Sequence, residues 1–362
     1  KHEFKKIFKG KNKWIVEKLS KVEDIDFLAD AELEFGGEKI SCNITIMPLT
    51  GGENESLGML LMIEDISNEK RMKSTMSRYM DADLADQLLE AGDGDDVMGG
   101  KESIGTVLFS DIRSFTTLTE SLGAQGTVGF LNDYFTVMVD CIQEEGGMLD
   151  KFIGDAIMAI FGTPVAHDDD PDRGLRAAIQ MMHGLNEFNA IRKSQGLPPV
   201  DHGMGLNTDE IVSGNIGSPK RMDYTVIGDG VNLAARVESS CKKYGAHILM
   251  SEYTFKALKA TYRTRQVDCV VVKGKTEPVN VYEVLDYHSK ESFPNMIEVL
   301  EMFNNGIEYY NEGNWDKAIT QFKKAQKGNP DDKASNMYVE RCGILKKRDP
   351  KDWDGVWVAT SK

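Results

Sequence analysis

The N-terminal part of the chain alternates between hydrophobic and polar residues in the way that strands do. Residues 40–49 and 57–66 are predicted to be two strands, and the turn-forming run at 50–54 joins them. Over residues 65–92 the apolar spacing changes to the steps of a helix, which would end at Gly92. The apolar positions of that helix are Met72, Met76, Tyr79, Leu84 and Leu88. A run rich in Gly and Asp at 92–100 then marks a domain boundary.

Strands and helices follow one another in the next part of the chain. Residues 106–109 form a buried type of strand, and residues 125–145 carry apolar positions along one helical face. Two apolar strands are predicted at 148–153 and 156–161. Gly154-Asp155 lies between them, and a glycine in such a pair is typical of a tight hairpin turn.

The same pattern continues to about residue 287. An apolar stripe over 175–188 predicts a helix, and a hairpin followed by a helix is expected over 203–244. Paired strands at 265–273 and 278–285 end the unit. Helices packed on a sheet of this kind give an α+β sandwich, which is the fold class that we predict.

Residues 295–345 return to helical spacing. A turn at Gly313-Asn314 separates two apolar stripes, and Pro330 follows the second. This helix–turn–helix resembles one tetratricopeptide-type unit. Because a single unit cannot bury both of its faces, we expect it to cap the neighbouring domain. The basic run at 346–351 and the end around Trp353 suggest no chemistry, only an exposed or docked tail.

Composition and charge narrow the class of protein. The chain has 362 residues, enough for two or three domains, and its net charge of −15 argues against general binding to nucleic acid or anionic membranes. The first 21 residues hold eight Lys and two Glu, which we interpret as a solvated surface.

Apolar runs and the spacing of cysteines and histidines indicate the cellular compartment and the kind of metal site to expect. The longest uncharged apolar run has seven residues, at 57–63, and a membrane-spanning helix needs about 20. The five cysteines form no CxxC pair, and the six histidines form no HxxxH pair, which suits the cytoplasm and disfavours a zinc site. Since the sequence begins with Lys1, we expect a fragment whose true start, and any membrane anchor, lies outside it.

Four features could carry chemistry. Asp111 ends a strand, Asp155 lies in a hairpin turn, and Asn232 and Arg236 stand one helical turn apart, so they share a face. Lys273-Gly274-Lys275 ends a later strand. Two strand-end carboxylates are what magnesium ions bound together with a polyphosphate require. Each feature alone is ordinary turn, cap or edge-strand chemistry, so the combination needs independent support.

That support comes from three motifs in order. They are FSDIRSFT at 109–116, LDKFIGDAIMA at 149–159, and YTVIGD with VNLAAR at 224–236. They resemble the class III nucleotidyl cyclases, most closely the bacterial and cyanobacterial-type adenylyl cyclases, over about 103–287. The resemblance implies a ferredoxin-like α/β sandwich.

The flanking segments resemble parts of the same proteins. Residues 1–70 are similar to the second half of a PAS domain that ends in Ile63-Glu64-Asp65-Ile66. Residues 71–102 resemble the helical linker that joins PAS or GAF sensors to such cyclases. The catalytic domain would cover 103–288, and the TPR-like tail 289–362 is also similar to theirs.

The resemblance implies a role for each candidate residue. Asp111 and Asp155 would bind two Mg²⁺ or Mn²⁺ ions per active site, with the Ile112 carbonyl as a further ligand. Arg236 would stabilise charge at the α-phosphate in the transition state, and Asn232 would orient the ribose. Lys273 would contact the terminal phosphates, with Lys275 as a second candidate.

Lys151 and Thr225 would recognise the base. Adenine offers an acceptor at N1 and a donor at N6, which pair with an ammonium donor and a hydroxyl acceptor. Guanylyl cyclases usually carry an acidic residue at the position of Lys151, so ATP is the expected substrate. Thr at position 225 is a feature of the subgroup described as bicarbonate-responsive, and activation by bicarbonate is carried as a hypothesis.

The leading interpretation is therefore a cytoplasmic, sensor-regulated adenylyl cyclase that acts as a homodimer. One subunit would supply Asp111 and Asp155 to each site, and the other would supply the residues for base, ribose and α-phosphate. Two alternatives remain: a catalytically silent dimeric signalling module, and a guanylyl cyclase. The signal that is sensed cannot be predicted, because the ligand-binding half of the PAS domain is absent from the sequence.

Overall fold

The chain forms two compact units, residues 1–92 and 93–362, which are described separately. The computed structural model describes residues 4–22, 24–51, 56–67, 70, 100–218, 221–271 and 278–357. Within these ranges no helix has the length and the apolar character that crossing a membrane requires. The predicted linker helix over 65–92, with its apolar stripe, lies almost wholly outside the described residues.

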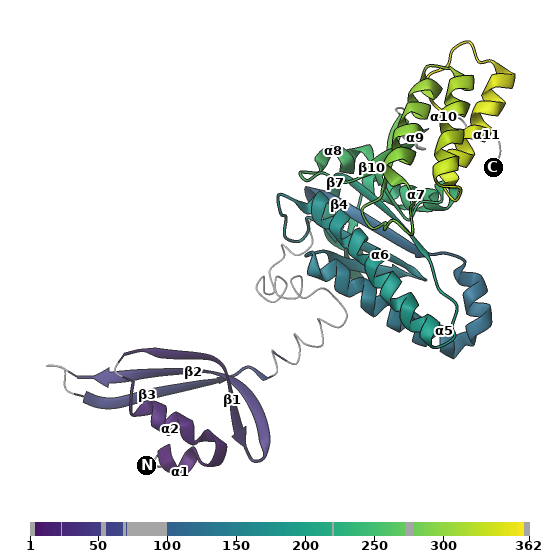
Figure 1. Ribbon diagram of the computed structural model, residues 1–362. Coiled ribbons are helices and arrows are strands. Elements are labelled where there is room, and N and C mark those ends of the chain that lie inside the picture. Colours follow the sequence, from purple (N-terminus) through teal and green to yellow (C-terminus); the bar gives the residue numbers. More distant parts are fainter. Residues whose placement is uncertain are drawn as a thin grey trace. The chain divides into compact units, whose positions relative to one another are not determined.

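The first unit is built on a three-stranded antiparallel sheet. Its strands β1 (Asp26–Phe35), β2 (Glu38–Thr50) and β3 (Ser56–Asp65) lie in that order (Figure 1). The strands predicted at 40–49 and 57–66 are confirmed as β2 and β3. Strand β1 was not predicted, because a bulge near Asp30 interrupts its alternation, and Asp30 has a positive φ of 57°.

Short N-terminal helices cover one face of this sheet. They are α1 (Phe4–Ile7), the 3₁₀ turn η1 (Gly10–Asn12) and α2 (Lys13–Leu19). Ile15 packs in one apolar core with buried residues of β1 and β2. The lysine-rich surface is solvated, as expected, and Lys11 forms an ion pair with the strand β1 residue Glu34 at 2.6 Å.

The second unit contains an eight-stranded mixed sheet. The strand order is β10-β11-β9-β7-β4-β6-β5, and β8 pairs with the far half of the long strand β7. Strands β7 and β9 run parallel, and the other pairs are antiparallel. The strands are β4 (Lys101–Ile112), β5 (Met148–Ile153), β6 (Ala156–Phe161), β7 (His202–Ser218), β8 (Arg221–Ile227), β9 (Ile248–Ser251), β10 (Thr264–Val271) and β11 (Pro278–Val284).

Helices cover both faces of this sheet (Figure 1). Leu108 of β4 packs in one core with side chains of α5 and α6, whereas its neighbour Val107 packs with Ala234 of α7. Since successive strand residues face opposite sides, α5 and α6 lie on one face and α7 on the other. The helices are α5 (Phe115–Glu144), α6 (Asp170–Ser194), α7 (Asp229–Tyr244) and α8 (Glu252–Ala257). The predicted α+β sandwich is present as a mixed sheet with helices.

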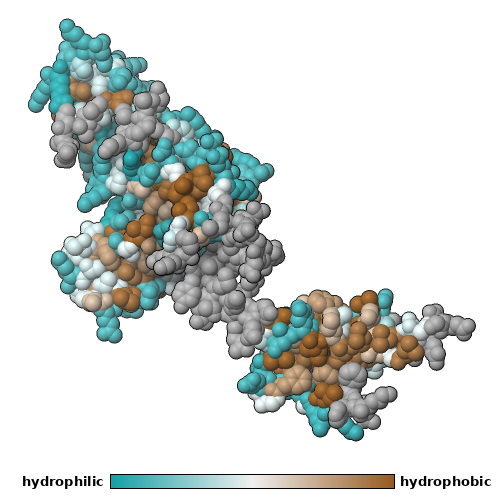
Figure 2. Space-filling model, turned by 180° about the vertical axis from the view of Figure 1, so that it is seen from behind, coloured by the Kyte–Doolittle hydropathy of each residue, from teal (hydrophilic) through white to brown (hydrophobic). Residues whose placement is uncertain are grey.

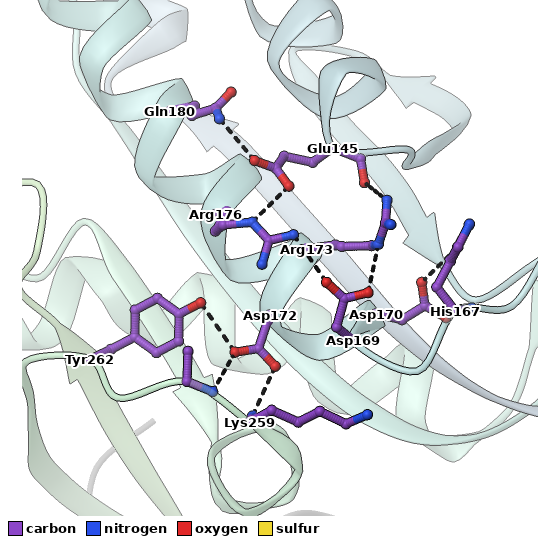
Figure 3. A network of polar contacts seen from close by, with 11 residues as sticks. Glu145, His167, Asp169, Asp170, Asp172, Arg173, Arg176, Gln180, Lys259 and Tyr262 are labelled. Carbon is purple, nitrogen blue, oxygen red and sulfur yellow. Dashed lines mark hydrogen bonds and ion pairs between the residues drawn. The ribbon is translucent and has the colours of Figure 1, made fainter.

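Polar contacts tie α5 and α6 to each other and to a later loop (Figure 3). Glu145, just after α5, accepts a hydrogen bond from Arg176 of α6 at 2.8 Å. The buried Asp172 accepts hydrogen bonds of 2.9 Å from the two backbone N–H groups of residues 259 and 260, and one of 3.2 Å from the Tyr262 hydroxyl. These contacts fix the start of α6, and they use no residue of the predicted site.

Helix α7 packs unusually close to the sheet at Gly205 of β7. An alanine Cβ at this position would lie 2.6 Å from Cα of Glu238 and 2.7 Å from the carbonyl oxygen of Ala234, and closer still to the Glu238 nitrogen. All three atoms belong to the backbone of α7. Glycine is therefore required here for the helix to reach the sheet.

The C-terminal segment forms three helices: α9 (Met296–Asn311), α10 (Trp315–Gly328) and α11 (Lys333–Arg348). The turn predicted at 313–314 lies between the first two. The third helix extends the predicted helix–turn–helix. The segment after it docks on α9, because the Trp353 indole N–H donates a hydrogen bond to the Tyr310 carbonyl at 2.9 Å.

Buried ion pairs attach these helices to the sheet, as the expected cap requires. Arg265 of β10 makes two hydrogen bonds of 2.9 and 2.6 Å to Asp332, and a third of 2.7 Å to Glu283 of β11. Arg341 of α11 makes two bonds, of 3.0 and 2.8 Å, to Asp268 of β10. The charged side chains in these contacts are at most 4% exposed.

Candidate active site

Two carboxylates meet at the end of neighbouring strands. Asp111 lies near the end of β4, and Asp155 lies in the two-residue turn between β5 and β6, where Gly154 has a φ of +68°. Strand β6 pairs directly with β4, and Ser110 is opposite Ile157. The hairpin turn that the sequence predicts thus carries Asp155 to the side of Asp111.

The electrostatics of the two groups reflect their proximity. Burial raises the pKa of the Asp111 carboxyl, and the nearby negative charge of Asp155 raises it further. Burial also raises the pKa of Asp155, although hydrogen bonds from the backbone N–H groups of Asp155 and Ile112 oppose that shift. A cation between the two carboxylates would relieve their repulsion.

The donor set fits a hard divalent ion. Two carboxylates and the Ile112 carbonyl offer oxygen ligands only. In the ranges that the structure describes, no group of three or more His, Cys, Asp or Glu side chains is placed to hold a metal. A site with so few protein ligands suits a magnesium-type ion that takes its other ligands from phosphate and water.

Helix α7 presents the next two candidates. Asn232 and Arg236 are exposed and one turn apart, as predicted, while Leu233 and Val237 are buried against the sheet. The contact at Gly205 lies beneath the same helix and fixes its distance from β7. The placement of both side chains therefore depends on how α7 packs.

The two residues expected to recognise a base come from different strands. Lys151 lies on β5 with a side chain that is 39% exposed, and Thr225 is buried on β8. Asp150 precedes Lys151 on β5, and its carboxylate lies 3.4 Å from the Lys151 ammonium. Burial raises the pKa of Asp150, whereas the Thr225 hydroxyl and the Lys151 charge lower it. The structure thus brings Lys151 and Thr225 to one buried carboxylate.

Not every prediction can be compared with the structure. Lys273 and Lys275 lie outside the described residues, which stop at Val271 and resume at Pro278 on either side of them. The roles given to the other candidates remain predictions, although the structure places their side chains.

Sequence reasoning missed two acidic residues at this site. One is Asp150; the other is Glu238 of α7, whose pKa is raised to about 7 by burial and by the charge of Asp111, with a smaller effect from Asp155. Glu238 stands two positions after Arg236, just beyond the end of the third motif. An acidic residue on a helix is usually solvated, so no local pattern indicates that Glu238 lies near the carboxylate pair.

Named relatives of the chain are nucleotidyl cyclases. The terminal-differentiation specific adenylate cyclase of Dictyostelium discoideum is 37% identical over 66% of this chain and 11% of its own length. The adenylate cyclase of Anabaena cylindrica is 42% identical over 49% of this chain and 36% of its own length. The solved guanylyl cyclase Cya2 is 39% identical over 52% of this chain and 94% of that chain, with a TM-score of 0.47. The chain spans a minor part of the two curated relatives.

A match to a known family covers the carboxylate pair, the base-binding candidates and α7. Residues 99–285 match the family described as the Adenylate and Guanylate cyclase catalytic domain. The match includes all three motifs and all the strands of the eight-stranded sheet. The chain belongs to this family, the class III nucleotidyl cyclases.

Proposed function

We propose that the protein is an adenylyl cyclase, which converts ATP into 3′,5′-cyclic AMP and pyrophosphate. The observation that carries this proposal is the meeting of Asp111 and Asp155 at adjacent strand ends, within a chain of the cyclase family. The relatives from Dictyostelium and Anabaena, both named adenylate cyclases, support the choice of ATP.

Asp111, Asp155 and the Ile112 carbonyl would hold two Mg²⁺ or Mn²⁺ ions. When bound, such ions lower the pKa of the ribose 3′-hydroxyl and neutralise charge on the triphosphate. The 3′-oxygen attacks the α-phosphorus in line, its bond to phosphorus forms, and the bond to the pyrophosphate oxygen breaks. No side chain of this chain is assigned as a general base.

The remaining residues position the substrate. The forked guanidinium of Arg236 stabilises the charge that develops on the α-phosphate oxygens. Asn232 orients the ribose, and Lys273 contacts the terminal phosphates. In phosphoryl transfer, positioning and charge neutralisation supply most of the rate enhancement, so these contacts are central to the reaction.

Lys151 and Thr225 select the base. The Lys151 ammonium donates to N1 of adenine, and the Thr225 oxygen accepts from the 6-amino group. Guanine would place an N1 donor against Lys151, which is also a donor. The family includes guanylate cyclases, so guanylyl cyclase activity is the competing proposal.

The active unit is a homodimer whose two sites are shared between the subunits. Large apolar side chains are exposed on the hairpin and on β8: Phe152 is 45% exposed, Ile153 52% and Ile227 52%. Hydrophobic residues also gather on the face of the second unit that Figure 2 shows. A two-fold interface would cover such a surface. One subunit supplies Asp111 and Asp155, and the other supplies Lys151, Thr225, Asn232 and Arg236.

The segments around the catalytic domain (103–288) carry further proposals. Residues 1–70 form part of a PAS-like sensor, supported by the helix-covered antiparallel sheet of the first unit. Residues 71–102 are the signalling linker, and 289–362 a TPR-like tail. All five cysteines are free, which supports a cytoplasmic location.

Mixing inactive variants tests the activity and the dimer together. Asp111→Ala and Arg236→Ala homodimers should each be nearly inactive with ATP. After subunit exchange half of the dimers are mixed, and each mixed dimer has one intact site, so roughly one quarter of wild-type activity should return. The matched control mixes Asp111→Ala with Asp155→Ala, which should recover nothing because both residues come from the same subunit.

The possible results separate the alternatives. Wild-type protein is offered ATP and GTP together with Mg²⁺ or Mn²⁺, and cyclic AMP should be the main product. Mainly cyclic GMP would show that the base assignment is wrong, and no cyclic nucleotide would favour the silent signalling module. No recovery on mixing would show that each site is built within one chain.

A further inference from the structure

Asp150 is a buried carboxylate without a conventional partner. Its side chain is fully buried, yet neither carboxylate oxygen has a hydrogen bond of ordinary geometry within the part of the chain that the structure describes. The nearest ammonium, that of Lys151, lies 3.4 Å away. A buried charge of this kind is costly, so its presence calls for a reason.

A β-bulge turns Asp150 toward Lys151. In the pairing of β5 with β6, Leu149 is opposite Ala159 and Lys151 is opposite Met158, which leaves Asp150 as the extra residue. Neighbouring residues of a regular strand point to opposite faces. The bulge removes that alternation and lets the two side chains approach each other, as bulges beside active sites do.

Strand β8 carries Thr225, which also lies near Asp150. Met148 of β5 and Val226 of β8 belong to the same apolar cluster, so the two strands contribute side chains to one core. Thr225 is 8% exposed, and its hydroxyl is close enough to lower the pKa of Asp150. Asp150, Lys151 and Thr225 therefore form one local group, defined here as the Asp150 triad.

The chemistry of the triad is directional. A threonine hydroxyl has one proton and two lone pairs, and it can turn to serve as donor or acceptor. An ionised carboxylate only accepts. If the Thr225 proton points at Asp150, the lone pairs of the Thr225 oxygen are left for the ligand, and the hydroxyl can no longer donate to a guanine O6.

We propose that Asp150 is a positioning residue that sets the polarity of base recognition: its carboxylate accepts a hydrogen bond from the Thr225 hydroxyl and steers the Lys151 ammonium, so that the Thr225 oxygen only accepts from the ligand. This inference rests on the proposed adenylyl cyclase activity, and it adds a third residue to the two that contact the base. Buried as it is, Asp150 acts through its neighbours and does not touch the substrate.

The test compares substrates that differ at one group. Purine riboside triphosphate keeps N1 but lacks the 6-amino group, so it isolates the contact with Thr225. In the full chain, Asp150→Asn should lower the preference for ATP over this analogue about tenfold in kcat/KM, the value of one hydrogen bond. The preference for ATP over GTP should fall as well, because the asparagine amide can donate to Thr225 and reverse its hydroxyl.

Two controls identify the cause. Asp168→Asn removes a fully exposed charge in the loop before α6, and it should leave the preference for ATP over the analogue within about twofold of wild type. In a Thr225→Val background, Asp150→Asn should have no further effect on that preference, because Asp150 acts through the hydroxyl that is missing.

The outcomes can be told apart. Equal loss of activity with ATP and with the analogue would show that Asp150 only supports the fold, and it would overturn the inference. Asp150→Ser, smaller and also uncharged, is measured in parallel, and failure of both variants to fold would count against the inference in the same way. If the wild type is active and Asp150→Asn leaves both substrate preferences unchanged, this inference alone is refuted. A wild type that forms no cyclic AMP refutes the proposed function as well.

Discussion

Replacing Gly205 with alanine tests how the fold supports the active site. The new Cβ would lie 2.6 Å from Cα of Glu238 and 2.7 Å from the carbonyl oxygen of Ala234. Carbon atoms in contact are ordinarily about 3.5–4.0 Å apart. Because the opposing atoms are helix backbone, no side-chain rotation can relieve the clash, and α7 must move by roughly an ångström.

The size of the effect follows from this geometry. Overpacking a core costs about 1–3 kcal/mol when side chains can adjust, so a clash with backbone should cost about 3 kcal/mol or more. In a folded body of this size each kcal/mol lowers Tm by about 2–4 °C, so Tm should fall by about 6 °C or more. Activity should also fall at temperatures where the variant is still folded, because Asn232 and Arg236 move with the helix.

Gly129→Ala is the matched control. Gly129 lies in α5, is exposed, and has no atom within 4 Å of the position that a Cβ would take. Alanine is favoured over glycine inside a helix by about 1 kcal/mol, so Tm should rise slightly. Thermal unfolding by circular dichroism and cyclic AMP formation at 25 °C would be measured for both variants. A Tm for Gly205→Ala within about 2 °C of wild type would refute the close approach of α7 to β7.

Two further predictions concern stability. Arg265→Met leaves two buried acidic partners without their cation, so it should lower the free energy of unfolding in urea by about 3–5 kcal/mol. Its control, Lys256→Met, removes an exposed ion pair and should change that free energy by less than about 0.5 kcal/mol. Similar values for the two variants would contradict the buried network. Burial holds the pKa of His202 at about 3, so below pH 6.5 the unfolded chain binds a proton that the folded chain does not, and stability should fall by about 2 kcal/mol between pH 7 and pH 5. This pH dependence should be weaker in His202→Gln, and an identical slope in the two proteins would contradict it.

The elements that were predicted well have strong local signals. The two apolar strands around Gly154-Asp155 appear as β5 and β6 with the predicted bounds, because the turn and the apolar runs are both encoded locally. Strand β9 and helix α8 were not predicted. They span four and six residues, too few for a period to show, and β9 is fixed instead by pairing with β7 and β11.

The acidic residues of the site show a different limit. The pairing of Asp111 with Asp155 could be inferred from the motifs and the hairpin. Asp150 could not, because a carboxylate beside a lysine is usually a solvated ion pair, and a bulge leaves no mark in the hydrophobic pattern. Arg265 and Asp332 stand 67 positions apart, so their buried contact could not be read from local sequence.

The boundary of the sequence family differs from the boundary of the folded body. The family match ends at residue 285, but Arg265 and Asp268 find their partners Asp332 and Arg341 beyond it. A catalytic domain exchanged between relatives at that boundary would bring two buried charges into a host that lacks their counterions. The tail and the catalytic domain should therefore be inherited, transplanted and varied as one module.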